Sequence, residues 1–430
     1  MNKQKSGNLL AIIVMILLFG MISFVTNLAS PMGDVLKNQF SVANWMGTLG
    51  VFANFIAYAI MGIPAGNILQ KRGYKFTALV AVAVGFTGVG VQAIAGLLTG
   101  NLAFGIYLLG AFIAGFSMCM LNIVVNPMLN KLAGGGNRGN QLLQVGGSFN
   151  SFMGTAVIFL VGIFVPSTID AEIKQVFPLM FIALAIFAIA FLVIIFTHIP
   201  ENEPQAVVRE EKSKIGPMSF RHFMLGAVAI FIYVGVEVGI PKVLESWLQG
   251  NPGEGGFGLA KSVASSVAAT YWLLMFFGRL AGAALGAKVS AKAMLTTASV
   301  LGVVLVLGAM FLDPANTVNM PAFKGAEGFG FANVPINAVL LVLCGLCTSV
   351  MWGGIFNLAV EGLGKYTEKA SGIFMAMVCG GGVLPLLQNY VVDLTGNFLV
   401  SYWVIVAGLG FLLFYALIGS KNVNKDIKVD

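Results

Sequence analysis

Long continuous runs of apolar residues alternate with short polar stretches along the whole of this 430-residue chain. Each run holds about 20 apolar residues, the length that an α-helix needs to cross the hydrocarbon core of a bilayer. Polar and apolar positions do not alternate within the runs, as they do in the strands of an outer-membrane barrel. The pattern predicts twelve spans, near residues 9–31, 45–69, 76–98, 102–131, 141–165, 177–198, 219–245, 262–286, 294–312, 333–360, 370–392 and 398–419.

The longest charged stretch, Ile199 to Met218, divides these spans into six and six. We therefore expect an all-α polytopic membrane protein with 12 transmembrane helices in two pseudo-symmetric six-helix halves. The halves are residues 1–198 and 219–430, and residues 199–218 form a linker on the cytoplasmic side. The first apolar run is interpreted as a span because it is too long for the core of a signal peptide.

Two short motifs support a duplication of the six-helix unit. Gly62–Gly66 and Gly278–Gly282 are small-residue segments that lie 216 residues apart, and each leads into a basic turn. A second pair, Gly146–Gly147 and Gly380–Gly381, lies 234 residues apart. The offset grows because the loop from Asp313 to Phe331 is longer than its counterpart. Two repeated halves of a transporter place a substrate site at their interface near the bilayer midplane.

Composition excludes a soluble domain. The chain is 58% hydrophobic and 10% charged, whereas soluble domains carry about 25% charged residues. The predicted spans place 19 of the Lys and Arg residues on one side of the membrane and 5 on the other. Basic loops stay in the cytoplasm, so both termini and the linker are expected there. The net charge of +7 is not interpreted as nucleic-acid affinity, because the basic residues lie mostly in loops.

Amide side chains gather in the spans of the first half. Asn122 and Asn126 are four residues apart and share one helix face. Gln144 and Asn150 lie in the next span, and Asn27 in the first. Such residues at membrane depth face a cavity or form hydrogen bonds between helices. Because amides both donate and accept hydrogen bonds, the set suits a neutral polyhydroxylated ligand.

The second half contributes the most deeply placed acid of the chain, Glu237. A buried carboxylate favours its neutral form unless it is paired, so Glu237 is a candidate for reversible protonation during transport. The alternative is that it holds a neighbouring helix by a hydrogen bond. Near the cytoplasmic end of the tenth span, Glu361 is expected to pair with Arg279 or Lys365.

Three further residues of the second half are candidates for substrate contact. Asn357 and Gln388 are amides within spans, and Trp272 offers a ring that could stack on a sugar or face the lipid. The pair Cys344 and Cys347 has CxxC spacing, but no second ligand pair lies nearby in the sequence, so no metal site is expected.

These residues lie in segments that resemble the major facilitator superfamily, and within it the glucose/galactose branch of the fucose–galactose–glucose–proton symporter family. The resemblance covers nearly the whole chain. It implies import of monosaccharides with a cation, usually a proton, across a bacterial inner membrane. Its most specific segments are Phe24–Leu28, Asn126–Pro127, Phe149–Ser151, Tyr233–Glu237 and Gly362–Thr367.

The resemblance also implies a role for the basic turn in gating, and it shows two departures from the family pattern. Gln70 occupies a position in the basic turn where an acid is usual, and Asn122 stands where the fucose branch has a glutamate. The acid of the first span is either Asp34 or is replaced by Ser30, depending on the alignment. The candidate gating residues are Gly66, Lys71, Arg72, Gly73 and Arg279.

We therefore expect a secondary transporter that imports a neutral monosaccharide, a hexose or a deoxyhexose, by proton symport with alternating access. Glu237 and Asp34 are the candidates for proton coupling. The alternatives are an importer of an acidic or amino sugar and a drug–proton antiporter. No enzymatic activity, cofactor or metal is expected, because no nucleophile, base and orienting acid gather in one region. The expected partners are the sugar, the proton and the lipid bilayer, with the protein a monomer.

Overall fold

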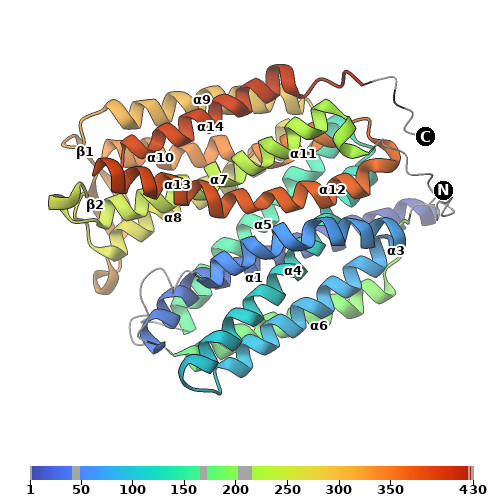
Figure 1. The fold of residues 1–430 in the computed structure, drawn as a ribbon, viewed down its shortest axis with the longest axis horizontal. Helices are drawn as coiled ribbons and strands as arrows, with labels where there is room; N and C mark the ends of the chain where they lie inside the picture. The colour runs from blue at the N-terminus through green and yellow to red at the C-terminus, as the bar shows by residue number, and fades with distance from the viewer. Residues whose placement is uncertain (1, 41–48, 165–171, 202–215, 425–426, 428–430) are drawn as a thin grey trace. The chain divides into compact units, whose positions relative to one another are not determined.

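The computed structural model describes residues 2–40, 49–164, 172–201, 216–424 and 427 of the chain (Figure 1). Helices dominate because a segment in lipid has to satisfy its backbone hydrogen bonds internally. The α-helices are α1 (Asn2–Phe40), α3 (Leu49–Ala95), α4 (Gly100–Ala133), α5 (Gly136–Phe164), α6 (Phe177–Phe196), α7 (Arg221–Gln249), α8 (Lys261–Leu285), α9 (Ala291–Phe311), α10 (Ile336–Thr348), α11 (Met351–Val360), α12 (Thr367–Ala376), α13 (Gly380–Thr395) and α14 (Trp403–Phe414). Shorter helical turns are η1 (Ile173–Val176), η2 (Pro217–Ser219), η3 (Pro252–Glu254), η4 (Gly325–Glu327), η5 (Gly364–Tyr366), η6 (Met377–Cys379), η7 (Val400–Tyr402) and the π-helical η8 (Tyr415–Gly419).

The expected membrane architecture is confirmed in the described part of the chain, where ten helical segments are long and apolar enough to span a bilayer. One of them, α3, has 47 residues, about 70 Å of helix. It includes most of the second and third expected spans, and residues 45–48 of the second lie outside the described residues. The fifth expected span lies in α5. The tenth span is formed by α10 and α11 in succession, and the eleventh by α12, η6 and α13.

Gly73 divides α3 into its two legs. Its φ angle of 81° places it outside the helical region, in a conformation that glycine adopts without a steric penalty. The Glu201 carboxylate accepts hydrogen bonds from the backbone N–H groups of Tyr74 and Lys75, both at 2.7 Å. An acid at the start of a helix satisfies unpaired N–H groups and complements the helix dipole, so Glu201 caps the second leg.

The chain forms two compact units, and the first comprises Met1–Phe220, Gly362–Val378 and Asn424–Asp430. Within it, α3 packs along α4, and α1 packs on α5. The short helix α12 also belongs to this unit and packs against α3. A Cβ atom built on Gly66 would lie 2.8 Å from the Cα atom of Gly372, so these helices approach at backbone distance.

The second unit comprises Arg221–Glu361 and Cys379–Val423. In it, α7 packs against α11 and α13, and α10 packs against α8 and α9. The expected linker, 199–218, falls largely in residues 202–215, which lie outside the described residues. The division into 1–198 and 219–430 therefore stays a prediction.

A β-hairpin interrupts the helical pattern where the sequence showed only a long loop. Strands β1 (Thr317–Phe323) and β2 (Phe329–Pro335) pair antiparallel, with Thr317 opposite Pro335 and Phe323 opposite Phe329. The hairpin connects α9 to α10 and lies at the ends of the helices of its unit (Figure 1). The tenth span consequently begins at Ile336 rather than near residue 333.

Candidate functional site

The two asparagines of α4 are buried and bonded to each other. The Asn126 amide donates to the Asn122 carbonyl oxygen at 2.8 Å and to Asn122 Oδ1 at 3.3 Å. The Asn122 amide in turn donates to Tyr58 Oη in α3 at 2.9 Å. The spacing of four residues therefore places both amides on one face, as expected, and joins them to a phenol of a neighbouring helix.

Tyr58 is a polar residue of this cluster that the sequence did not reveal. Its side chain is buried in the first leg of α3, and its hydroxyl holds the Asn122 amide. A tyrosine in an apolar run is indistinguishable from an ordinary core aromatic until its partner is known. The available signal is Asn54, which stands four residues earlier and gives the same helix face a second polar group.

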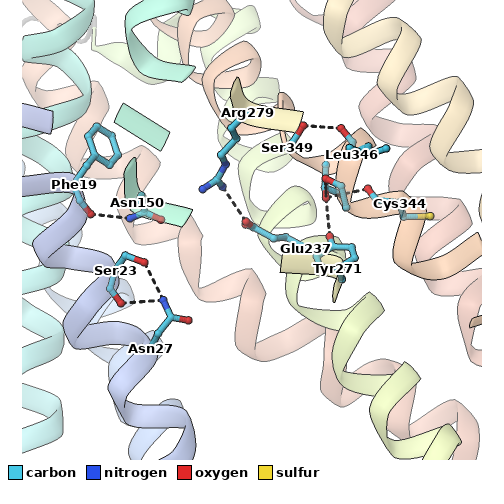
Figure 2. Close-up of polar contacts among 12 residues, drawn as sticks. Phe19, Ser23, Asn27, Asn150, Glu237, Tyr271, Arg279, Cys344, Leu346 and Ser349 are labelled. Carbon is cyan, nitrogen blue, oxygen red and sulfur yellow. Dashed lines mark hydrogen bonds and ion pairs between the residues drawn. The ribbon is translucent and has the colours of Figure 1, made fainter. Parts of the chain in front are cut away.

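The other amides of the first unit occupy separate positions (Figure 2). Asn150 of α5 donates to the backbone oxygen of Phe19 in α1 at 2.9 Å, so it joins two helices. Asn27 donates within α1, to the backbone oxygen and the hydroxyl of Ser23. Gln144 is buried in α5. The backbone of Asp34 lies in α1, but its side chain is outside the described residues.

In the second unit, Glu237 of α7 forms an ion pair with Arg279 of α8 (Figure 2). Arg279 Nη2 lies 3.2 Å from Glu237 Oε1, and the two side chains are 9% and 13% exposed, respectively. Arg279 was expected near the cytoplasmic turn beside Glu361, but its charge is directed to the deepest acid of the chain instead. A buried ion pair of this kind is costly to break from either side.

Aromatic side chains surround this ion pair. Tyr233, one turn before Glu237 on α7, packs against Trp352 of α11 with ring centroids 6.2 Å apart. The Tyr271 hydroxyl is 2.7 Å from Thr348 Oγ1, and the Tyr271 ring meets Trp272 edge to face. The ion pair itself is largely buried, which strengthens its electrostatic attraction.

Gln388 of α13 has an unusual environment. It is fully buried, and neither its Oε1 nor its Nε2 atom has a hydrogen-bond partner within the described part of the chain. Gly239 of α7 lies against its Oε1 atom. Leaving buried polar groups unpaired costs free energy. The unpaired amide of Gln388 therefore indicates a function that offsets this cost. Asn357 of α11 is also buried.

The gating candidates of the first unit lie around the Gly73 break. Lys71 and Arg72 are exposed, and the Arg72 guanidinium stands over the Phe76 ring at 5.6 Å. Tyr74 donates to Glu368 Oε1 of α12 at 3.4 Å. Lys75 Nζ donates to the backbone oxygens of Ile195 and Thr197 at the end of α6. The turn is therefore tied to both α6 and α12.

The chain is similar to several known proteins. The sequence profile of the Major Facilitator Superfamily matches residues 10–384. A glucose/galactose transporter of Brucella abortus is 29% identical over 415 residues, which cover 94% of this chain and 93% of that protein. An L-fucose-proton symporter of Escherichia coli is 22% identical over 408 residues, covering 87% of this chain and 86% of its own length.

The fold has a close counterpart among solved structures. The crystal structure of the Escherichia coli fucose:proton symporter superposes with a TM-score of 0.77 at 21% identity, covering 96% of this chain and 100% of the symporter. At this identity the match concerns the fold. Because the family profile covers most of the chain, and a relative aligns over nearly its full length, the protein belongs to the major facilitator superfamily.

Proposed function

We propose that the protein is a secondary transporter that brings a neutral monosaccharide into a bacterial cell by proton symport. The observation that carries this proposal is the nature of the buried polar groups. In the described part of the first unit they include the paired amides of Asn122 and Asn126 and the amide of Gln144. Neutral donors and acceptors of this kind match the hydroxyl groups of a sugar.

The names of the relatives support the substrate class and the coupling ion. One relative is a glucose/galactose transporter, and another is an L-fucose-proton symporter. We extend both properties to this chain as a hexose or deoxyhexose substrate and a coupled proton. Alternating access is the mechanism: the protein exposes its binding residues to one side of the membrane and then to the other, and the ligand shifts the balance between these states.

Glu237 is the proposed proton carrier. Its carboxylate is charge-paired with Arg279, so a proton that binds to Glu237 releases the arginine from its partner. Protonation and a local rearrangement are thereby linked. Asp34 remains a second candidate for the same role.

The proposed location is the inner membrane, with both termini in the cytoplasm. The distribution of 19 against 5 basic residues supports this orientation.

The test is uptake into proteoliposomes that contain the purified protein. Labelled glucose, galactose and fucose are offered with and without an inwardly directed proton gradient, and a sodium gradient is the comparison. We expect the proton gradient to drive accumulation of at least one sugar. Accumulation that only a sodium gradient drives would exclude the proton, and absence of uptake for all three would contradict the substrate class.

The variant Glu237→Gln tests the carrier. It should lose accumulation but keep exchange of labelled for unlabelled sugar, because exchange requires no net proton movement. Retained exchange also shows that the variant is folded. Glu361→Gln, which changes an exposed acid of the same unit, is the matched control. Normal accumulation by Glu237→Gln would show that the carboxylate is structural.

One observation favours a second candidate substrate, an acidic sugar. Arg279 is buried and faces an acid rather than the cytoplasmic turn. A sugar carboxylate could compete with Glu237 for the guanidinium group, which binds carboxylates through two parallel hydrogen bonds. Glucuronate in the same uptake assay distinguishes the two: competition by glucuronate but not by glucose would favour the acidic substrate.

A further inference from the structure

The β1–β2 hairpin carries a face of exposed phenylalanine rings. Phe323 lies directly opposite Phe329 in the strand register, and residues opposite one another share a face of the sheet. Phe331 stands two residues farther along β2, on the same face. The three side chains are 40%, 78% and 65% exposed, respectively. The Phe323 and Phe329 rings also contact each other, with centroids 5.3 Å apart.

The opposite face of the hairpin is attached to the helices. Ala322 and Val334 point to that face and are buried. At the tip, the Phe323 backbone N–H donates to Ser266 Oγ of α8 at 3.0 Å, and Gly325 lies beside Ser262. The hairpin is therefore fixed against the first turns of α8, so its aromatic face has a defined direction.

The side of α8 that receives the hairpin tip carries exposed apolar residues. Leu273, Phe277 and Leu280 are exposed apolar residues in this membrane-spanning helix. Ser266 precedes Leu273 by seven residues, two helical turns, so it lies on the same side of the helix. The tip consequently stands about 10 Å along the helix axis from Leu273, at the edge of this exposed apolar surface.

Other aromatic residues mark the same edge. Phe311 ends α9, 74% exposed, and packs edge to face on the exposed Trp403 at the start of α14. Trp side chains, such as that of Trp403, concentrate where a membrane protein passes from hydrocarbon to water. The hairpin leaves α9 just beyond Phe311 and enters α10 without an intervening residue. The phenylalanine face therefore lies at the same height along the helix axes as this boundary.

The composition of the strands fits lipid better than a charged partner. Neither β1 nor β2 contains a charged residue, and the connecting turn carries one basic and one acidic residue, Lys324 and Glu327. We propose that the hairpin is a membrane anchor, which seats Phe323, Phe329 and Phe331 between the head groups and acyl chains of the leaflet on its own side. This inference rests on the membrane-spanning fold alone and is independent of the proposed substrate.

Spin labelling in liposomes tests the anchor. Phe329→Cys and Phe331→Cys are made in the full-length protein with its four native cysteines replaced by alanine, and each is labelled with a nitroxide. The vesicles contain phosphatidylcholine and phosphatidylglycerol. The ratio of collisions with oxygen, which is enriched in lipid, to collisions with a water-soluble nickel chelate should be several-fold higher at both sites than at Gly253→Cys, a control in the exposed turn η3.

A ratio equal to that of the control would overturn the anchor and leave the hairpin in water. If a neutral sugar reduces collisions of the labels with both reagents, the aromatic face binds a saccharide, and the anchor is overturned. A ratio that rises only with the density of protein in the vesicles would indicate that the hairpin contacts a second copy of the protein, which would also overturn the anchor. If the cysteine-free protein does not fold, Phe329→Trp in the native sequence gives a second measurement. Lipids brominated near the head group should then quench more of its fluorescence than that of the parent, and equal quenching would count against the anchor.

Discussion

The Glu237 carboxylate and the Arg279 guanidinium lie 3.2 Å apart, although 42 residues separate them along the chain. This pair joins α7 to α8 at the only acid that the sequence places deep in a membrane-spanning segment of the second half. The contribution of the pair to the stability of the fold can be separated from its role in transport by experiment. Removing one charge leaves the other buried and unpaired, whereas removing both leaves no buried charge.

Single neutralisation of the pair should destabilise the protein more than double neutralisation. Glu237→Gln or Arg279→Gln leaves one buried charge without its partner, which costs about 3–5 kcal/mol in buried pairs. The double variant removes both charges and should recover much of that loss. Thermal unfolding of the four proteins in detergent measures the coupling. Strictly additive effects would mean that the two charges do not interact energetically.

Replacement of Gln388 by methionine should stabilise the fold and weaken transport. The amide of Gln388 is buried without a partner in the described part of the chain, and removal of such a group relieves about 1–3 kcal/mol of desolvation cost. Gln388→Met keeps a similar volume, so its thermal midpoint should rise while sugar uptake falls. Gln249→Met, at an exposed position on α7, is the control. An unchanged midpoint together with normal uptake would show that Gln388 has neither role.

Gly66→Ala should disrupt the contact between α3 and α12. The added methyl group would lie 2.8 Å from a backbone atom of Gly372, so one helix has to move. Gly105→Ala is matched to it, because nothing lies within 4 Å of a Cβ atom at that helical position. Alanine is the better helix former by about 1 kcal/mol, so the control should be neutral or stabilising. We expect the thermal midpoint of Gly66→Ala to fall below that of the control, and equal midpoints would contradict the tight contact.

Tyr58→Phe should raise the KM for the transported sugar while the protein stays folded. The hydroxyl orients the Asn122 amide, which retains its bond to the Met118 carbonyl oxygen when the phenol is lost. A single hydrogen bond between membrane helices contributes about 0.6 kcal/mol, so the effect on stability should be small. Initial rates of uptake at several sugar concentrations measure KM. Tyr390→Phe, at an exposed site, is the control, and an equal KM in both variants would remove Tyr58 from the site.

The sequence predicted features that depend on periodicity, and it missed those that depend on contacts between distant segments. Apolar run length located the spans, and the spacing of Asn122 and Asn126 predicted their shared face. Glu237 stood out by its depth alone. Its partner was not evident, because Arg279 lies in a small-residue motif that leads into a basic turn and was therefore assigned to the cytoplasmic end of its span. A contact between side chains of two helices also leaves no periodic signal in the sequence.

The hairpin was missed for a different reason. Strand β1 contains Pro321, which is unusual within a strand, and β2 contains Gly330. Both residues reduce the local preference for strand in a short segment. The extra length between Asp313 and Phe331 was visible as an enlarged offset between the halves, but length alone does not indicate secondary structure.

The placement of α12 separates its position in the sequence from its position in the fold. The chain enters this helix from Glu361 and leaves it at Cys379, and both of those residues belong to the second unit, whereas α12 itself packs in the first. The helix is therefore a loop of chain whose two ends are covalently fixed to one body while its side rests on another. The backbone approach of Gly66 and Gly372 lies within the first unit and holds α12 against α3. A segment that the sequence places in the second half is thereby built into the first unit, and its attachment depends on two residues without side chains.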